Sequence, residues 1–478
     1  MTAIRRTKIV ATLGPASTPP DVLERMIVAG VDVVRLNFSH GDVNAFIPLA
    51  ERILSTADKV GRTVAILADL QGPKIRIARF RQDKVFLEVG QDFTLDASLD
   101  SQSGDEHQVG IDYPQLVKDV GAGDTLLLDD GRVVLGVEDV VGNEVRCKVK
   151  IGGYLSNNKG INRLGGGLSA AALTDKDKND IQIAAKIQAD YVAVSFPRSA
   201  EDLNYARRLL RDAGGDGGIV AKLERAEAVE VMDEIILSCD AVMVARGDLG
   251  VEIGDAALPP IQKKIISRAR QLNTAVITAT QMMESMIENA IPTRAEVFDV
   301  ANAVLDGTDA VMLSGETAVG NNPIKVIEAV DRISLQAEQQ REIRRSRHRI
   351  DSEFEKVDEA IAMGAMYLAN HLDVKAIAAL TLSGSTATWM SRISSGIPIF
   401  ALTPNDKTSR KMTLYRGVYP VKFAVEERGH ATLNNAVIAL LERNGVVEIG
   451  DTVILTKGNA RLEGSTNTLK IVRVGDVD

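Results

Sequence analysis

The strongest constraint on the fold is a series of short, apolar, β-branched segments that alternate with helical patterns. Eight of them are apolar throughout, as is typical of parallel strands covered on both faces. They are Thr7–Leu13, Asp32–Phe38, Thr63–Leu70, Tyr191–Phe196, Gly218–Leu223, Ala241–Ala245, Ala275–Thr280 and Ala310–Ser314. Helical periodicity with capping residues lies between them, including Asp21–Ala29, Thr174–Gln188, Ser199–Ala213, Pro259–Gln271 and Thr293–Leu305. Eight strand–helix repeats predict a (β/α)8 TIM barrel, with a doubly wound open sheet as the alternative.

One interval between repeats is far longer than a loop. The third strand ends near Leu70, but its helix begins only near Thr174. The intervening β patterns are Lys84–Val89, Asp92–Asp96, Thr125–Asp129, Arg132–Val137 and Val145–Ile151, with a hairpin signal at Asp130-Gly131. The insertion follows the C-terminal end of a strand, where such barrels carry their chemistry. We therefore predict a small β-barrel lid domain over residues 73–169.

The chain after the eighth repeat has a different organisation. A charged, Arg-rich stretch, Glu338–Arg349, predicts a helix whose Arg341–Arg349 run faces solvent or another subunit. Alternating α/β patterns follow, with strands expected at Val374–Leu382, Pro398–Leu402, Val418–Phe423, Asp451–Thr456 and Thr468–Val474. The predicted domains are thus a barrel (1–72 and 170–340), the lid (73–169) and a C-terminal α/β domain (341–478).

Composition excludes several classes of partner. The 478 residues include 56 Lys and Arg and 65 Asp and Glu, which gives a net charge of −9. This charge disfavours binding to nucleic acid and to anionic membranes. Cys147 and Cys239 are too few for a zinc site or a disulfide framework and read as free thiols in a reducing compartment. No signal peptide and no membrane-spanning stretch is expected, because no apolar run is long enough. A cytoplasmic protein is the expectation.

Polar side chains terminate seven consecutive predicted strands, from the second to the eighth. In chain order they are Arg35, Asn37, Ser39 and His40; Asp69; Ser195; Lys222 and Glu224; Arg246 and Asp248; Thr280; and Ser314 and Glu316. Side chains at i and i+2 point to the same side of a strand, so Arg35, Asn37 and Ser39 are expected to converge. The same spacing predicts that Lys222 converges with Glu224, and Arg246 with Asp248.

These side chains match the needs of phosphoryl transfer. Glu224 and Asp248 offer two hard oxygen ligands, which suit a Mg²⁺ ion that keeps positions for water and substrate. Lys222 and Arg35 suit anionic oxygens, and a metal ion flanked by such cations stabilises a phosphoryl group in transfer. The alternative is a pair of rim salt bridges from the two carboxylates to Lys222 and Arg246.

Six motifs in order resemble pyruvate kinase, and the similarity covers nearly the whole chain. They are Lys8–Ser17, Arg35–Gly41, Asp69–Arg76, Ala245–Ile253, Thr278–Met286 and Met312–Ala318. The run Asn157–Ser169 is similar to the bacterial type II isoenzyme group. The resemblance implies transfer of phosphate from phosphoenolpyruvate to ADP, giving ATP and pyruvate in the last step of glycolysis. It also implies Mg²⁺, with Mn²⁺ as a substitute, and a homotetramer.

The resemblance carries roles to individual residues. Arg35 would bind the phosphate of phosphoenolpyruvate, and Lys222 would stabilise the phosphoryl group in flight. Glu224 and Asp248 would hold Mg²⁺, while the backbone at Gly247 and Asp248 would take the substrate carboxylate, as a helix start can.

Other roles implied by the resemblance concern the proton and the nucleotide. Thr280 would lie near the carbon that is protonated when enolpyruvate becomes pyruvate, and Ser314 and Glu316 would belong to the proton route. The nucleotide-side residues would be His40, Arg76, Lys159 and Lys176.

The resemblance also implies a monovalent-cation site. Its ligands would be Asn37, Ser39, Asp69 and the carbonyl of Leu70. The K⁺-dependent pattern of the family has Glu where this chain has Lys74, and an ammonium beside the transferred phosphate supplies the charge of the ion. K⁺ is therefore predicted to be dispensable; the alternative is that Lys74 faces solvent.

The C-terminal region contains a hydroxyl-rich segment after a predicted strand. Ser383, Ser385, Thr386 and Thr388 form a candidate phosphate nest, with ordinary helix capping as the alternative. In the family this segment binds phosphorylated effectors such as a sugar phosphate or AMP. Leu382 and Ser385 stand where the family usually has an acid and often a base, so the effector's identity stays open.

Two rival functions remain on the sequence alone. A Mg²⁺-dependent 2-keto-acid aldolase uses a similar barrel but lacks the inserted domain and the Lys222–Thr280 combination. A non-catalytic, effector-binding homologue would be expected to lose Lys222 or a metal ligand, and this chain keeps them.

Overall fold

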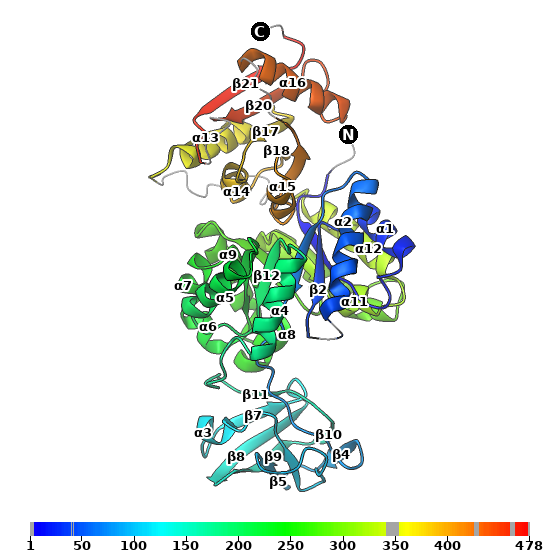
Figure 1. Cartoon of the computed structure of the whole chain (residues 1–478), viewed down its shortest axis with the longest axis vertical. Helices are drawn as coiled ribbons and strands as arrows, with labels where there is room; N and C mark the ends of the chain where they lie inside the picture. Colours follow the sequence, from blue (N-terminus) through cyan, green and yellow to red (C-terminus); the bar gives the residue numbers. More distant parts are fainter. Residues whose placement is uncertain are drawn as a thin grey trace.

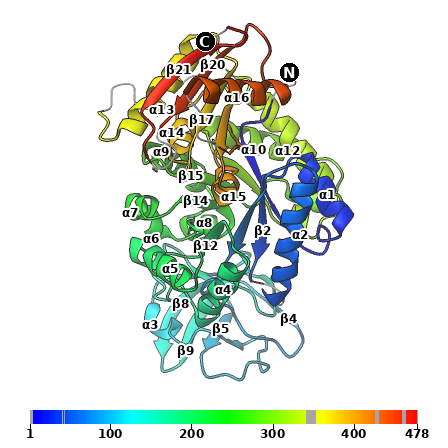
Figure 2. The ribbon, with the colours of Figure 1, turned by 45° about the horizontal axis from the view of Figure 1, so that its top comes forward.

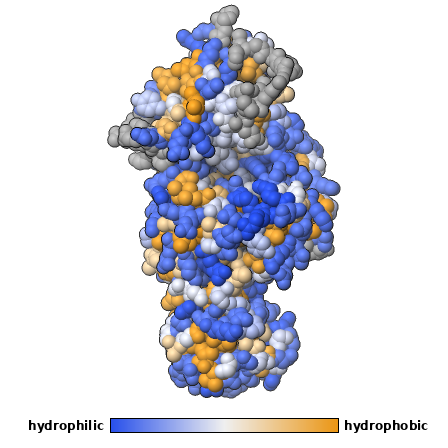
Figure 3. All heavy atoms as spheres, turned by 60° about the vertical axis from the view of Figure 1, so that its left-hand side comes forward, coloured by the Kyte–Doolittle hydropathy of each residue, from blue (hydrophilic) through white to orange (hydrophobic). Residues whose placement is uncertain are grey.

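The computed structural model describes residues 4–39, 41, 43–340, 353–424, 430–458 and 464–476. His40 and the Arg-rich run 341–349 lie outside the described residues. Figures 1 and 2 show three parts in a row, with the barrel between the β-rich insertion at one end and the C-terminal α/β part at the other. No helix in these ranges is long and apolar enough to cross a bilayer. Much of the face in Figure 3 is hydrophilic, with an apolar patch on the insertion.

The central part is a closed barrel of eight parallel strands, which confirms the predicted TIM barrel over the open sheet. The order around the barrel is β1-β16-β15-β14-β13-β12-β3-β2. The strands are β1 (Lys8–Thr12), β2 (Val33–Asn37), β3 (Ala65–Asp69), β12 (Tyr191–Val194), β13 (Gly218–Leu223), β14 (Ala241–Ala245), β15 (Ala275–Ala279) and β16 (Ala310–Leu313). Their side chains pack inward on one another and outward on the helices, which explains the continuous apolar runs.

The helices of the barrel follow their strands along the chain. They are α1 (Pro20–Ala29), η1 (Val43–Ala45), α2 (Phe46–Lys59), α4 (Asp175–Lys186), α5 (Ala200–Asp212), α6 (Ala226–Glu230), α7 (Met232–Leu237), α8 (Arg246–Ile253), α9 (Leu258–Gln271), η2 (Glu284–Ile287), α10 (Arg294–Asp306), α11 (Gly315–Ala318) and α12 (Pro323–Ala337). Two of the longer ones start at reciprocal capping boxes, Thr174 with Asp177 in α4 and Thr293 with Glu296 in α10.

The insertion after β3 consists of a six-stranded sheet, β11-β7-β8-β9-β5-β6, and a two-stranded sheet, β10-β4. Its elements are β4 (Lys84–Leu87), β5 (Asp92–Asp96), β6 (Gln108–Gly110), α3 (Leu116–Asp119), β7 (Thr125–Leu128), β8 (Val133–Val141), β9 (Glu144–Ile151), β10 (Gly153–Ser156) and β11 (Ile161–Arg163). The predicted turn at Asp130-Gly131 joins β7 to β8.

The predicted small β-barrel is closed only weakly. Arg76 bridges to Gly160 beside β11, and Ile77 bridges to Ile111 beside β6. The two edges of the six-stranded sheet are therefore joined through isolated bridges, because no continuous hydrogen-bonded ladder runs between them in the described residues. The bulges in the β8–β9 pair help to curl the sheet.

The C-terminal part is a five-stranded sheet in the order β19-β18-β17-β20-β21, with only β21 antiparallel. Its elements are α13 (Val357–His371), β17 (Ala376–Leu380), α14 (Ser385–Ser391), β18 (Ile399–Thr403), α15 (Asp406–Met412), β19 (Val418–Lys422), α16 (His430–Arg443), β20 (Thr452–Lys457) and β21 (Thr468–Arg473). It is attached to the end of the barrel where the strands begin.

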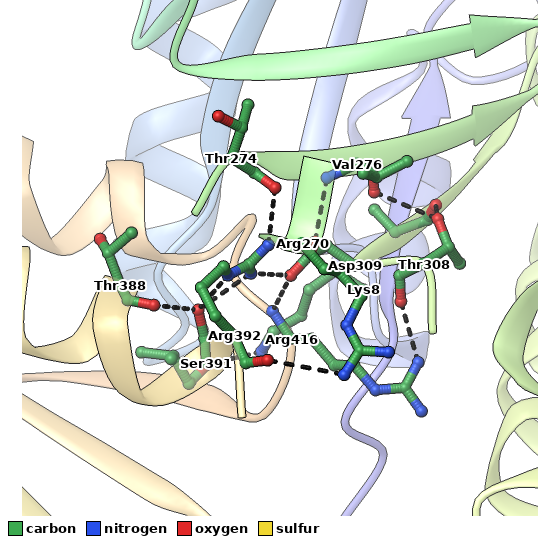
Figure 4. A network of polar contacts seen from close by, with 12 residues as sticks. Lys8, Arg270, Thr274, Val276, Thr308, Asp309, Thr388, Ser391, Arg392 and Arg416 are labelled. Carbon is green, nitrogen blue, oxygen red and sulfur yellow. Dashed lines mark hydrogen bonds and ion pairs between the residues drawn. The ribbon is translucent and has the colours of Figure 1, made fainter. Parts of the chain in front are cut away.

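A buried ionic network makes this attachment (Figure 4). Arg392, which follows α14, donates through Nη1 to Asp309 Oδ2 at 2.8 Å and to the carbonyl of Thr274 at 2.9 Å. Asp309 directly precedes β16, and it also accepts from the backbone N–H groups of Val276 and Arg416. Arg392 and Asp309 are each 1% exposed. Both charges are thus paired and hydrogen-bonded, as buried ions require.

Candidate active site

Lys222 lies at the centre of the cluster at the C-terminal mouth of the barrel. Its ammonium donates to Ser195 Oγ at 2.7 Å and lies 2.9 Å from Glu224 Oε1 and 3.4 Å from Asp69 Oδ1. Its predicted convergence with Glu224 is confirmed. Burial lowers the pKa of Lys222, but Asp69 and Glu224 outweigh it and hold the pKa above its usual value, so the charge is retained.

Arg35 approaches the same carboxylate from the neighbouring strand. Its Nε donates to Asp69 Oδ2 at 2.6 Å, and Nη1 donates to Thr12 Oγ1 at 3.0 Å. Burial acts to raise the pKa of Asp69, but the charges of Lys222 and Arg35 prevail and lower it. Asp69 is 1% exposed, and its Oδ1 accepts no hydrogen bond from the described residues. The mouth therefore holds two cations around an incompletely paired carboxylate.

Glu224 is the second carboxylate of the cluster. Its Oε2 accepts the backbone N–H of Phe196 at 2.9 Å, which orients the group. Burial raises the pKa of Glu224 to about 7; Lys222 opposes the shift and the nearby charge of Asp248 adds to it. Two neighbouring carboxylates that repel one another form a donor set that a hard divalent cation would stabilise. Glu224 and Asp248 thus fit the predicted Mg²⁺ ligands.

The predicted convergence of Arg246 with Asp248 is wrong. Helix α8 begins at Arg246, so residues two apart point to different sides instead of following the alternation of a strand. Arg246 turns away, donating to Asp299 Oδ1 at 2.7 Å and to the backbone carbonyl of Ala279 at 3.1 Å. The rim salt-bridge alternative therefore holds for Lys222 with Glu224 but not for Arg246 with Asp248.

The ends of β14 and β15 are joined through Thr280. The N–H of Gly247 donates to Thr280 Oγ1 at 2.9 Å, and the Thr280 hydroxyl donates to the Ala279 carbonyl at 2.7 Å. Thr280 has φ +66°, a left-handed conformation that is unusual for a β-branched residue. Such strain is held by the surrounding structure and collects at functional sites.

Glu316 is a backbone clamp between two strand ends. Its Oε2 accepts the N–H of Ser314 at 2.6 Å and its Oε1 accepts the N–H of Met283 at 3.1 Å. Glu316 as a whole is 3% exposed. This geometry holds the loops after β15 and β16 together.

Lys74, in the first connection to the insertion, reaches the mouth of the barrel. Its Nζ lies 3.6 Å from Asp248 Oδ1, with the Lys74 side chain 37% exposed. The alternative that Lys74 only faces solvent is therefore incomplete, since the ammonium also faces a carboxylate of the site.

The predicted cation ligands lie at the adjacent ends of β2 and β3. The backbone N–H of Ser39 donates to Asn37 Oδ1 at 3.1 Å, and the Leu70 carbonyl accepts from Ser195 Oγ at 2.8 Å. Of the three residues predicted to converge, only Asn37 and Ser39 are in contact. Arg35 turns to Asp69 instead.

The predicted nucleotide-side residues are spread over the barrel and the insertion. Arg76 lines a cleft between the two parts together with Ser39. Lys159 pairs with Asp129 Oδ1 at 2.7 Å inside the insertion. Lys176 Nζ donates to the Phe38 carbonyl at 2.6 Å. No contact between Lys176 and Lys159 occurs among the described residues.

Two of the four candidate effector residues line a cavity in the C-terminal part, and Ser383 and Thr388 do not. Ser385 and Thr386 line it with Lys457. Thr386 is buried and shares a hydrogen bond of 2.7 Å with Thr466, while Thr388 bonds back to the Gly384 carbonyl. The N-cap residue of α14 is Gly384, whose N–H donates to Thr381 Oγ1 at 2.9 Å, and the N–H of Ser385 donates to Ser383 Oγ at 3.4 Å. The capping alternative therefore accounts for Ser383. Ser383 lies next to Ser385, their Oγ atoms 3.3 Å apart.

The sequence reasoning gave no role to three groups that shape the mouth. Ser195 links Lys222 to the Leu70 carbonyl, Thr12 holds Arg35, and the Phe196 N–H orients Glu224. Ser195 was among the strand-end residues that the sequence singled out, and only its contacts were missing; Thr12 could have been found because it ends a barrel strand. The Phe196 contact is a backbone interaction and leaves no residue-type signal.

The chain matches two family models. Residues 4–327 match the model "Pyruvate kinase, barrel domain", and residues 359–472 match "Pyruvate kinase, alpha/beta domain".

Curated relatives agree with these models over nearly their whole length. The chain is 59% identical to pyruvate kinase II of Salmonella typhimurium over 476 residues, covering 98% of this chain and 99% of that one. It is 56% identical to pyruvate kinase of Haemophilus influenzae, covering 97% of each chain, and 40% identical to that of Thermotoga maritima, covering 98% of this chain and 100% of that one. The chain therefore belongs to the pyruvate kinase family, kinases that transfer phosphate from phosphoenolpyruvate to ADP.

Proposed function

We propose that the barrel-mouth cluster is the phosphoryl-transfer centre of the pyruvate kinase reaction and that Lys222 is its central catalytic residue. The observation that carries this assignment is the position of the Lys222 ammonium between Glu224 and Asp69. A charged, pre-positioned ammonium stabilises negative charge that develops on a transferring phosphoryl group. Pyruvate formation from phosphoenolpyruvate and ADP, coupled to lactate dehydrogenase, is the direct test, and absence of pyruvate would overturn the assignment.

Substrate binding is assigned to groups on both sides of Lys222. Arg35 is the phosphate-binding cation, supported by its rigid double attachment to Asp69 and Thr12. The backbone at Gly247 and Asp248 receives the carboxylate of the substrate, since α8 begins there. The Gly247 N–H, which donates to Thr280 Oγ1 in this structure, would exchange that partner for the carboxylate.

Pyruvate kinases depend on a divalent metal ion and, in general, on K⁺. We assign Glu224 and Asp248 as the Mg²⁺ ligands, with Mn²⁺ as a substitute. The bound ion would supply charge stabilisation to the phosphoryl oxygens. Two carboxylate ligands suit an ion whose remaining positions are completed by water and substrate.

The protonation of enolpyruvate is assigned to the end of β15. Thr280 is the residue nearest the reacting carbon, supported by its strained backbone and its contact with Gly247. Ser314 and Glu316 belong to the same region. Since both oxygens of Glu316 accept backbone N–H groups, we assign Glu316 the positioning of the loops rather than proton transfer itself.

The insertion, residues 73–169, is proposed to be a lid that closes over ADP. Arg76 and Lys159 would bring positive charge from the lid, and Lys176 from the barrel, with His40 as a further candidate. The cleft between lid and barrel supports this assignment. Small-angle scattering should show compaction on adding Mg²⁺, ADP and a phosphoenolpyruvate analogue, whereas an unchanged radius of gyration would contradict a closing lid.

K⁺ is proposed to be dispensable although Asn37, Ser39, Asp69 and Leu70 match its ligands. The support is Lys74, whose ammonium lies 3.6 Å from a proposed metal ligand and thus adds a fixed positive charge beside the phosphoryl site.

Regulation is assigned to the cavity beside Ser383, Ser385, Thr386 and Thr388, which would bind the phosphate of a sugar phosphate or AMP. Lys457 in its wall supplies a positive charge.

A homotetramer is the proposed assembly. Exposed apolar side chains on and beside α10 support subunit contacts, with Ile291 76% and Phe298 69% exposed.

A further inference from the structure

The second connection between the lid and the barrel contains three consecutive glycines with a defined backbone conformation. Gly165, Gly166 and Gly167 have φ values of +84°, +79° and +92°, three left-handed residues in succession. A Cβ atom on Gly166 would lie 2.4 Å from Glu227 Oε2. Glycine is thus required here both by the backbone conformation and by the close approach of a carboxylate.

Glu227 holds this glycine run from the barrel side. It belongs to α6, which directly follows the strand that carries Lys222. Its Oε1 accepts the backbone N–H of Gly167, and its Oε2 is buried without a hydrogen-bond partner in the described residues. A charge-assisted bond to a backbone N–H is stronger than a neutral one, so it restrains rotation at Gly167.

Arg225, two residues before Glu227 in the sequence, holds the same connection. Its Nη1 donates to the Leu168 carbonyl at 2.8 Å and its Nη2 to the Ala170 carbonyl at 3.4 Å. Arg225 is 4% exposed, and its guanidinium lies 5.7 Å from the centre of the Phe196 ring. The connection therefore has a fixed anchor at 168–170 and the glycine run immediately before it.

We propose that Glu227 is a positioning residue for nucleotide binding, because it latches the glycine run in the lid orientation seen here. In this orientation the lid extends from one end of the barrel (Figure 1), and a cleft lined by Ser39 and Arg76 lies between the two parts. Lys159 is paired with Asp129 of the lid itself. Closing the lid requires rotation about Gly165–Gly167, with Arg225 as the fixed point. The bond from Gly167 to Glu227 resists that rotation, so it lowers the population of the closed, nucleotide-holding state.

This inference rests on the proposed closure of the lid over ADP and predicts a specific kinetic split. Glu227→Ala should lower KM for ADP about three- to tenfold, because the closed state becomes easier to reach. KM for phosphoenolpyruvate should stay within about twofold, since Glu227 has no described contact with Lys222, Arg35 or Asp248. Glu227→Gln keeps an acceptor without the charge and should give a smaller decrease.

Glu230→Ala is the matched control, since Glu230 is an exposed carboxylate of the same helix. It should leave both KM values unchanged. The ligand-free Glu227→Ala protein should also have a smaller radius of gyration by small-angle scattering than the parent or the Glu230→Ala protein. Thermal unfolding of each variant identifies loss of folding separately.

The outcomes separate the latch from the function beneath it. If the parent chain makes no pyruvate, the proposed function fails. If the parent is active but Glu227→Ala and Glu227→Gln match Glu230→Ala, or if KM for ADP rises, the latch is wrong while the active site stands.

Discussion

The two ends of the barrel both hold buried charges, but they satisfy them differently. At the base, Asp309 accepts from Arg392, Val276 and Arg416 and is surrounded by donors from two parts of the chain (Figure 4). At the mouth, Asp69 Oδ1 accepts no hydrogen bond from the described residues, and the pKa of Glu224 is raised to about 7.

The difference shows what each end is built for. A fully paired ion at the base fixes the position of the C-terminal part, because any movement would leave a charge buried and unpaired. At the mouth, Asp69 has an oxygen without a hydrogen bond from the described residues, and Glu224 has a raised pKa. A metal ion and an anionic substrate can supply the missing partners. The contrast between a closed and an open ionic network leads to four tests.

The largest effect is expected from breaking the closed network. Arg392→Met should reduce the free energy of unfolding by about 3–5 kcal/mol, because Asp309 would remain buried without its cation. Trp389, the only tryptophan of the chain, lies three residues away in α14 and reports urea unfolding by fluorescence.

Arg208→Met is the control for this test. Arg208 forms an exposed ion pair with Glu201, and its loss should change the free energy by less than about 1 kcal/mol. Equal effects of the two substitutions would show that the base network is not a structural anchor.

At the open network, the main effect should be on catalysis. Lys222→Met should reduce kcat about 10²–10³-fold while KM for phosphoenolpyruvate changes little, because the charge acts chiefly in the transition state. Initial rates of pyruvate formation measure this effect, with the exposed Lys264→Met as the control. A kcat within about tenfold of the parent value, roughly 1.4 kcal/mol, contradicts the role of Lys222.

At the end of the barrel that carries the C-terminal part, Asp190 makes a pH-dependent contribution to the free energy of unfolding. Burial raises the pKa of Asp190 to about 6, although Arg410 opposes the shift. Between pH 4 and pH 6 the folded chain therefore binds more protons at this site than the unfolded chain, so this group's contribution to stability falls as pH rises. The free energy of unfolding of the parent minus that of Asp190→Asn should decrease by about 2–3 kcal/mol across this range.

The control for Asp190 is Asp212→Asn, an exposed carboxylate at the end of α5. Its difference from the parent should be flat between pH 4 and pH 6. A difference for Asp190→Asn that grows with pH would mean that Arg410, rather than burial, dominates the pKa.

The smallest effect concerns the monovalent cation at the mouth. In tetramethylammonium buffers, adding KCl should change the initial rate less than about tenfold, equivalent to roughly 1.4 kcal/mol, if Lys74 supplies the charge as proposed. Lys74→Glu removes that charge and should make the rate depend on K⁺. A larger K⁺ response in the parent chain would show that Lys74 does not replace the ion.

Much of the barrel was predictable because strands that are buried on both faces have continuous apolar sequences. The strands Gly218–Leu223 and Ala241–Ala245 were predicted with the observed bounds, and the others differ by one or two residues at their ends. The short strands β6, β10 and β11 were missed, since they carry too few residues to show a period.

The candidate site was predictable where the chain stays extended and failed where it changes conformation. Lys222 and Glu224 share a side because β13 sets their direction. Arg246 and Asp248 have the same spacing but lie in α8, so the period of two does not apply. A helix that starts directly at the end of a strand leaves no spacing signal of its own.

The sequence by itself determined the eightfold repeat, the place of the insertion and the polar residues at the strand ends, because these depend on local period and residue type. Only the tertiary structure decided the partners of the charges. Arg392 meets Asp309, 83 residues earlier, and Glu227 meets Gly167, 60 residues earlier. Such pairs form where the fold closes, and the free energy of pairing depends on burial, which a linear pattern does not encode.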